Sequence, residues 1–158
     1  MIGFTKEKLS IRGRLNGESP FENNLSPAPL KEREIQRERL ISNLTKMVLI
    51  MEYDGSGYCG FQLQANLPTI QDEIEKALAR LTSERVRVAA ASRTDSGVHA
   101  LGQVISFKTR SLLVPGAFVS GLNHYLPIGI AVKAAHRVSD SFNVRRHAIG
   151  REYSYYIL

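Results

Sequence analysis

The sequence predicts an α+β domain in which an antiparallel sheet carries two helices on one face. Four stretches between residues 47 and 138 are short apolar runs or alternate apolar and polar residues, as strands do. Two stretches with helical periodicity separate the first strand from the second and the third from the fourth. The resulting β-α-β-β-α-β order is that of the ferredoxin-like fold. Its second sheet face is left free to bind a partner.

The first strand and the first helix have the clearest signals. The strand is predicted over residues 47–53 (MVLIMEY), an apolar run that ends at the turn sequence DGSG. The helix is predicted over residues 68–81, where Thr69 suits the N-cap and Asp72, three residues later, comes close to a capping box. The apolar face of this helix is expected to pack on the sheet and consists of Ile70, Ile74, Ala77, Leu78 and Leu81.

The remaining elements follow in order. The second strand is predicted over residues 85–90 (RVRVAA) and the third over residues 103–109 (QVISFKT). The second helix is predicted over residues 114–126, with a proline suited to its first turn. The fourth strand covers residues 130–138 (IAVKAAHRV). A further strand begins at residue 153 (YSYYIL) without a following partner, so we interpret the chain as truncated.

Composition divides the chain into three parts. Residues 1–45 form a predicted extension, with a disordered Gly-, Asn-, Ser- and Pro-rich stretch followed by a charged stretch of helical propensity. Met47 begins the first folded element, so it is also a candidate for the true start of the protein. Residues 46–140 form the predicted ferredoxin-like domain, and residues 141–158 begin a second half.

Charge and composition limit the functional classes. The 158-residue chain carries a net charge of +6, which suits a polyanionic partner such as nucleic acid, although an ordinary basic surface fits equally well. A single cysteine excludes an internal disulfide and offers no metal cluster. No apolar run approaches the ~20 residues that cross a membrane, and the amino terminus lacks a signal-peptide core. We therefore expect a cytoplasmic protein without a resident metal.

The stretch SRTDSGVHALGQ, residues 92–103, holds the candidate site. Asp95 is ionised at neutral pH and can act as a nucleophile without an activating base. Arg93 can orient this carboxylate through a bidentate pair, or contact a phosphate. His99 can hold the loop or act as a general acid, and we favour a structural role. A polar turn would also explain Asp-Ser-Gly, so local chemistry leaves both interpretations open.

The loop resembles the catalytic-loop motif of the tRNA pseudouridine synthase A family, in which an arginine, a threonine and the nucleophilic aspartate precede GVHA. The resemblance extends almost continuously over residues 47–158. Two positions depart from the family pattern: Ser92 stands where the family usually has glycine, and Phe61 where it usually has tryptophan. Four other stretches agree in order and spacing: YDGSGYCGFQLQ (53–64), TIQDEIEKAL (69–78), GLNHYLP (121–127) and SFNVRRHAIGREYSYYI (141–157).

The resemblance assigns roles to individual residues. It implies that Asp95 is the catalytic nucleophile and that Arg93 and Thr94 shape the loop around it, while we assign His99 to the support of the loop. Tyr153 matches the family tyrosine that stacks on the target base. Three arginines would lie near RNA phosphates, although a solvated strand edge explains each of them as well: Arg145, Arg146 and Arg151.

The implied reaction is the isomerisation of uridine to pseudouridine in the anticodon stem-loop of tRNA, at positions 38–40, by a homodimer without a cofactor. The target uridine must leave its stack, and the nucleophile adds either to the base or to the ribose. Family members have a second half that completes the base pocket, so this chain is also a candidate for an inactive fragment. The alternative is a non-catalytic RRM-like RNA-binding module, whose third strand would be rich in Gly and Phe. The predicted third strand contains only Phe107.

Overall fold

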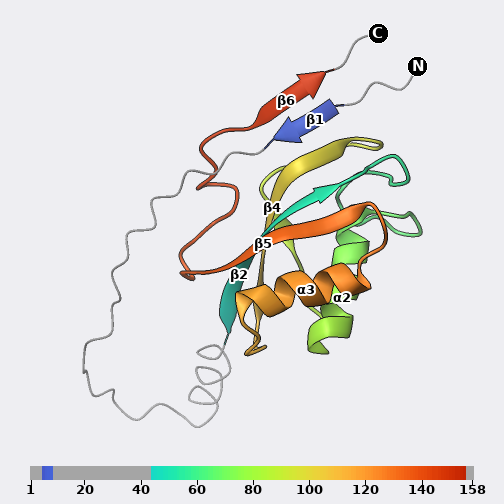
Figure 1. Cartoon of the computed structure of the whole chain (residues 1–158). Helices are drawn as coiled ribbons and strands as arrows, with labels where there is room; N and C mark the ends of the chain where they lie inside the picture. The colour runs from blue at the N-terminus through green and yellow to red at the C-terminus, as the bar shows by residue number, and fades with distance from the viewer. Residues whose placement is uncertain (1–4, 9–43, 156–158) are drawn as a thin grey trace, which may run out of the picture.

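The computed structural model of the chain describes residues 5–8 and 44–155. Within these residues the predicted β-α-β-β-α-β order is confirmed, and one short strand on either side of this unit joins the same sheet (Figure 1). The elements are β1 (Thr5–Lys8), β2 (Thr45–Tyr53), α2 (Ile70–Thr82), β3 (Ala89–Ala90), β4 (His99–Thr109), α3 (Pro115–Tyr125), β5 (Ile130–Val138) and β6 (Glu152–Tyr155).

The strand order is that of a ferredoxin-like sheet with an addition. β2 lies between β5 and β4 and pairs with both in the antiparallel sense. β3 pairs with the second half of β4, at Ser106 and Ile105. β1 runs parallel to the first half of β4, at His99 and Ala100, and β6 pairs antiparallel with β1. The edge of β4 that faces away from β2 is therefore shared by β3 and β1.

Alternation along β2 sends its side chains into two clusters. Met47, Leu49 and Met51 are fully buried in the main core, which the sheet forms with both helices. Val48 belongs to a second cluster on the opposite face, together with Val144 from the segment after β5. Period-two alternation thus places one set of residues under the helices. The second face of the sheet is partly covered by the chain that follows β5.

The predicted N-terminal residues of both helices are confirmed. Thr69 is the N-cap of α2, and its side chain accepts a hydrogen bond from the backbone N–H of Asp72 at 3.4 Å. Ser83 caps the other end in the left-handed conformation, with φ of 59°. Pro115 occupies the first turn of α3, where the missing N–H removes no helical hydrogen bond.

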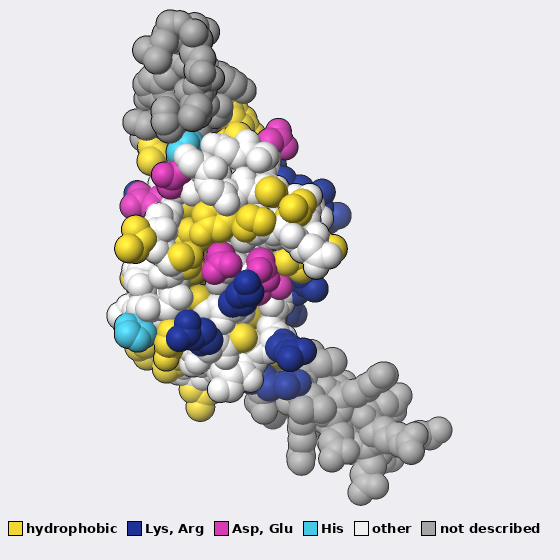
Figure 2. All heavy atoms as spheres, turned by 90° about the vertical axis from the view of Figure 1, so that its right-hand side faces the viewer, with side chains coloured by type: hydrophobic (Ala, Val, Ile, Leu, Met, Phe, Trp, Pro, Cys, Tyr) yellow, Lys and Arg dark blue, Asp and Glu magenta, His cyan; other side chains and the backbone are white. Residues whose placement is uncertain are grey.

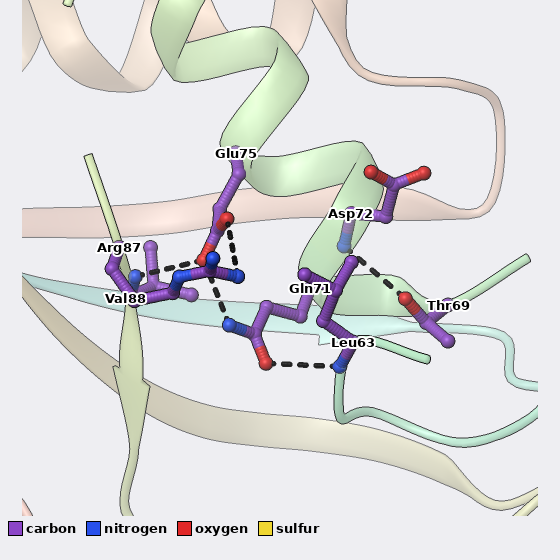
Figure 3. Close-up of polar contacts among 7 residues, drawn as sticks. All are labelled: Leu63, Thr69, Gln71, Asp72, Glu75, Arg87 and Val88. Carbon is purple, nitrogen blue, oxygen red and sulfur yellow. Dashed lines mark hydrogen bonds and ion pairs between the residues drawn. The ribbon is translucent and has the colours of Figure 1, made fainter. Parts of the chain in front are cut away.

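The second predicted strand is much shorter than expected, because residues 85–88 are held by α2. The carboxylate of Glu75 accepts a hydrogen bond from the backbone N–H of Val88 at 3.0 Å and pairs with Arg87 at 3.3 Å (Figure 3). Gln71 Nε2 donates to the same carboxylate at 2.7 Å. Only Ala89 and Ala90 are left to pair with β4.

Two further elements differ from the sequence prediction. β4 begins at His99, four residues before the predicted start. β1 lies within residues 1–45, where the sequence predicts no strand, and it inserts between β4 and β6. Residues 9–43, which include the predicted disordered and helical stretches, lie outside the described residues. None of the described helices is long and apolar enough to cross a membrane.

Substitutions in the core and on the surface should differ in their effect on the free energy of unfolding. Phe118 on α3 is fully buried and packs edge-on against Phe107 of β4. Phe118→Ala should lower the free energy of unfolding by about 3–5 kcal/mol, because both packing and transfer terms are lost. Leu112→Ala, at a side chain that is 90% exposed, should change it by less than about 0.5 kcal/mol. Urea titration of the two variants compares them, and equal losses would contradict the assigned core.

Candidate active site

Residues 91–98 connect β3 to β4, and we call them the Asp95 loop. The loop closes on itself through the backbone N–H of Val98, which donates to the carbonyl of Asp95 at 3.2 Å. Gly97 takes a φ of +77°, which favours glycine. Asp95 itself is exposed at the bend. The backbone around the carboxylate is ordered by hydrogen bonds while the carboxylate remains open to solvent.

Thr94 fixes the position that precedes Asp95. Its side chain is buried, and its Oγ1 lies 2.8 Å from the hydroxyl oxygen of Tyr53 at the end of β2. Its carbonyl accepts a hydrogen bond from the backbone N–H of Phe61 at 3.0 Å. Gln103 on β4 donates through Nε2 both to the Tyr53 hydroxyl at 3.3 Å and to the Ser92 carbonyl at 2.9 Å. The loop is therefore held from β2, β4 and the turn after β2.

The turn after β2 lies directly against the Asp95 loop, and its glycines permit the approach. A Cβ on Gly55 would lie 2.1 Å from the carbonyl oxygen of Val98. A Cβ on Gly60 would lie 2.9 Å from the carbonyl oxygen of Thr94, and this glycine also has a φ of +92°. The carbonyl of Tyr58 accepts hydrogen bonds from both Ser96 and Gly97, as the Ser96 hydroxyl lies 3.2 Å away and the Gly97 nitrogen 3.3 Å away. The turn after β2 therefore supports the Asp95 loop.

His99 is tied to the same turn. Its Nδ1 lies 3.1 Å from a carboxylate oxygen of Asp54, and its side chain is mostly buried. The backbone N–H of Ser56 lowers the pKa of Asp54, with further lowering from the Ser56 hydroxyl and from His99. Burial raises the pKa of Tyr58 in this turn, and the carboxylates of Glu73 and Asp54 raise it further. This placement favours the predicted role of His99 in supporting the loop.

The predicted arginines fall into two groups. Arg145 Nε donates to the carbonyl of Ala90 at 3.1 Å, and Arg151 Nη2 donates to the carbonyl of Ala91 at 2.9 Å. These two side chains hold the chain at the junction of β3 and the Asp95 loop. Arg93 and Arg146 are exposed. Within the described residues no ion pair joins Arg93 to Asp95, so the sequence-based idea of a bidentate pair gains no support.

Tyr153 lies beside the loop. It is 48% exposed on β6, and its hydroxyl oxygen lies 3.5 Å from the Ser92 hydroxyl. The φ of Ser92 is not positive, so serine causes no backbone strain where the family usually has glycine. Phe61, the second departure, is buried, with its ring centroid 6.2 Å from that of Tyr53. Neither departure disturbs the loop.

A shallow hollow of about 350 Å³ adjoins the loop. Its lining includes Phe61 and Gln71 as well as three arginines, Arg87, Arg93 and Arg145. The hollow meets the Asp95 loop at Arg93, and its lining includes three guanidinium groups. Guanidinium groups in a concave site suit phosphates of a nucleic acid.

Comparison with known proteins identifies the class of the domain. A sequence model described as tRNA pseudouridine synthase matches residues 49–145. The chain belongs to this family. It is 50% identical over 114 residues to tRNA pseudouridine synthase A of Blochmanniella pennsylvanica, covering 72% of the chain and 44% of that relative. It is 48% identical over 113 residues to tRNA pseudouridine synthase A of Nitrosomonas eutropha, covering 72% of the chain and 41% of that relative. The chain spans less than half the length of these relatives.

Sequence reasoning missed several residues that support the loop. Gln103 appears there only as the first residue of a strand, although it bonds both Tyr53 and Ser92. Gly55 and Gly60 appear only as turn residues. Three glycines within six residues, at positions 55, 57 and 60, indicate a turn, but nothing in the sequence indicates which segment lies against it.

The contact between the two motifs predicts unequal effects of two similar substitutions. Gly55→Ala should destabilise the domain by about 1–3 kcal/mol, because the new methyl group would overlap the Val98 carbonyl and displace backbone. Gly57→Ala is the matched control, since a Cβ there has nothing within 4 Å, and it should change stability by less than about 0.5 kcal/mol. Thermal unfolding of both variants measures this. A Gly55→Ala variant as stable as Gly57→Ala would contradict the described contact.

Proposed function

We propose that this chain carries the catalytic loop of a tRNA pseudouridine synthase, with Asp95 as the nucleophile. The observation that carries the proposal is the contrast within the loop. Asp95 is exposed, whereas its neighbour Thr94 is buried and bonded to Tyr53 and Phe61. A carboxylate on a backbone that is fixed in advance can be aimed at a substrate without paying for ordering during the reaction. Membership of the family supports the same assignment.

The proposed reaction rearranges one nucleotide without net oxidation or reduction. The bond between N1 of uracil and C1′ of ribose breaks, the base turns, and C5 bonds to C1′. The proton on C5 is lost to solvent, and N1 gains a proton. Asp95 adds to the base or to C1′ and is released at the end, so the carboxylate is regenerated. No cofactor is needed to balance these steps.

The neighbouring residues receive roles that agree with their positions. Tyr153 is half exposed beside the loop, where its ring can stack on a uracil that has left its helix. Arg93 and Arg146 are exposed and can contact phosphates. Arg145 and Arg151 hold backbone carbonyls through one N–H each, and a guanidinium carries five, so both can also bind a phosphate.

The finer assignments rest on the family resemblance. The name of the relatives supports tRNA as the substrate. From the resemblance we propose the anticodon stem-loop, positions 38–40, as the target and the cytoplasm as the location. We also propose a homodimer. Because the matched relatives are more than twice as long as the matched region, residues outside it are expected to complete the base pocket. Membership of the family therefore does not by itself imply that this chain is active alone.

The binding-module alternative is less well supported by the sheet. An RRM stacks bases on aromatic residues of its open sheet face. Here the side chains of β2 and β4 in the second cluster are aliphatic, namely Val48, Ile50 and Val104, and Phe142 and Val144 pack against them. Bases would not reach an aromatic platform at this position.

The direct test is tritium release from tRNA labelled at C5 of uracil. It is run with the chain alone and with the remaining part of a relative supplied as a second polypeptide. Asp95→Ala should abolish release in whichever arm the unaltered chain is active, because the nucleophile is gone. Asp72→Ala, on the exposed side of α2, is the control and should leave release unchanged. Release that survives Asp95→Ala, or no release in either arm, would contradict the proposal.

A further inference from the structure

A second and larger hollow lies at the start of β3, on the side away from the Asp95 loop. It has a volume of about 840 Å³, and the chain segments 83–89, 106–110 and 143–145 border it, together with the start of β2. We call it the basic groove. Six of the side chains that line it are basic: Lys46, Arg85, Arg87, Lys108, Arg110 and Arg145.

The groove exists because residues 85–88 do not pair with β4. Glu75 on α2 accepts the backbone N–H of Val88 and pairs with Arg87, and its own position is set by Gln71 (Figure 3). Gln71 is in turn anchored by the backbone N–H of Leu63, which donates to its Oε1 at 3.1 Å. These contacts draw the segment toward α2 and leave the end of β4 open beside it.

The positive charge of the groove is only partly balanced. Its one acidic lining residue, Glu84, already accepts hydrogen bonds from the Thr109 hydroxyl at 2.9 Å and from the backbone N–H of Arg110 at 3.1 Å. Lys108 pairs with Asp140 at 2.9 Å. Within the part of the chain that the structure describes, Arg85 forms no ion pair with an acidic side chain, and neither does the guanidinium of Arg110.

Other surfaces differ from the groove. On α2, Lys76 pairs with both Asp72 and Glu73, at 2.6 and 3.4 Å. The face shown in Figure 2 likewise carries acidic and basic side chains beside one another near its centre. Unbalanced positive charge in a concave site raises the local concentration of anions, whereas mixed charge does not.

The basic groove is continuous with the hollow beside the Asp95 loop. Arg87, Ala89 and Arg145 line both. Arg93, two residues from Asp95, lines the hollow beside the loop. A chain of phosphates that enters the groove at Arg85 and Arg110 would therefore pass Arg87 and Arg145 and reach Arg93 in the Asp95 loop.

We propose that the basic groove binds the phosphate backbone of the RNA that flanks the target uridine. The proposal rests on the proposed function, since it takes RNA as the substrate of the same site. Arg85 and Arg110 line the basic groove but not the hollow beside the loop, and they bind phosphates. They have no part in the chemistry at Asp95.

The test is the salt dependence of binding of a labelled anticodon stem-loop RNA to the full chain, measured by fluorescence anisotropy. Arg85→Gln combined with Arg110→Gln should weaken binding about tenfold or more at low salt. It should also reduce the slope of log K against log salt by about 1.4–1.8, because each phosphate contact releases about 0.7–0.9 counterions. Both positions are exposed, so the thermal midpoint of unfolding should not change.

The control removes the same charge elsewhere. Arg80→Gln combined with Lys133→Gln lies outside both hollows, since Arg80 stacks on Tyr125 and Lys133 pairs with Glu52. It should leave the salt slope unchanged. Equal losses in the two double variants, or no loss in the groove variant, would overturn the proposal. Because the readout is binding, loss confined to the groove variant supports the groove even where tritium release fails, so the two proposals are tested separately.

Discussion

The buried hydrogen bond between the hydroxyls of Tyr53 and Thr94 is the constraint on which the site depends. It joins the end of β2 to the residue before Asp95. Gln103 on β4 bonds the same tyrosine and the loop backbone, so two neighbouring strands of the sheet control one loop. Such a network must be satisfied throughout, because a buried hydroxyl without a partner costs about 1–3 kcal/mol. Its result is an exposed carboxylate on a backbone that does not need to be ordered when substrate arrives.

Those parts of the fold whose signal is local were predictable from the sequence. β2 and β5 follow their apolar patterns because one face of each lies in the core, and α2 begins at Ile70 because the side chain of Thr69 caps the helix. β3 was not predictable in length, since the group that takes the N–H of Val88 is Glu75, thirteen residues away on another element. The early start of β4 depends in the same way on a partner strand, because Ala100 pairs with Tyr53.

The candidate site shows the same division. Asp95 and its motif are visible in the sequence, and the resemblance names Tyr153 and the arginines. That Arg145 and Arg151 each hold a carbonyl where β3 meets the loop follows only from the folding of residues 141–151 back onto the end of β3. The glycines after β2 read as turn formers until the Asp95 loop is seen against them. Long-range packing decides these roles, and a single sequence does not contain it in readable form.

Amide hydrogen exchange across the Asp95 loop tests most directly whether the Tyr53–Thr94 bond orders it. Thr94→Val removes the hydroxyl at nearly constant volume, and Thr94→Ser keeps it. The amide of Phe61, which donates to the Thr94 carbonyl, should exchange about tenfold faster or more in Thr94→Val and at the unaltered rate in Thr94→Ser. Equal exchange of this amide in the two variants would contradict the central claim that this hydrogen bond fixes the loop.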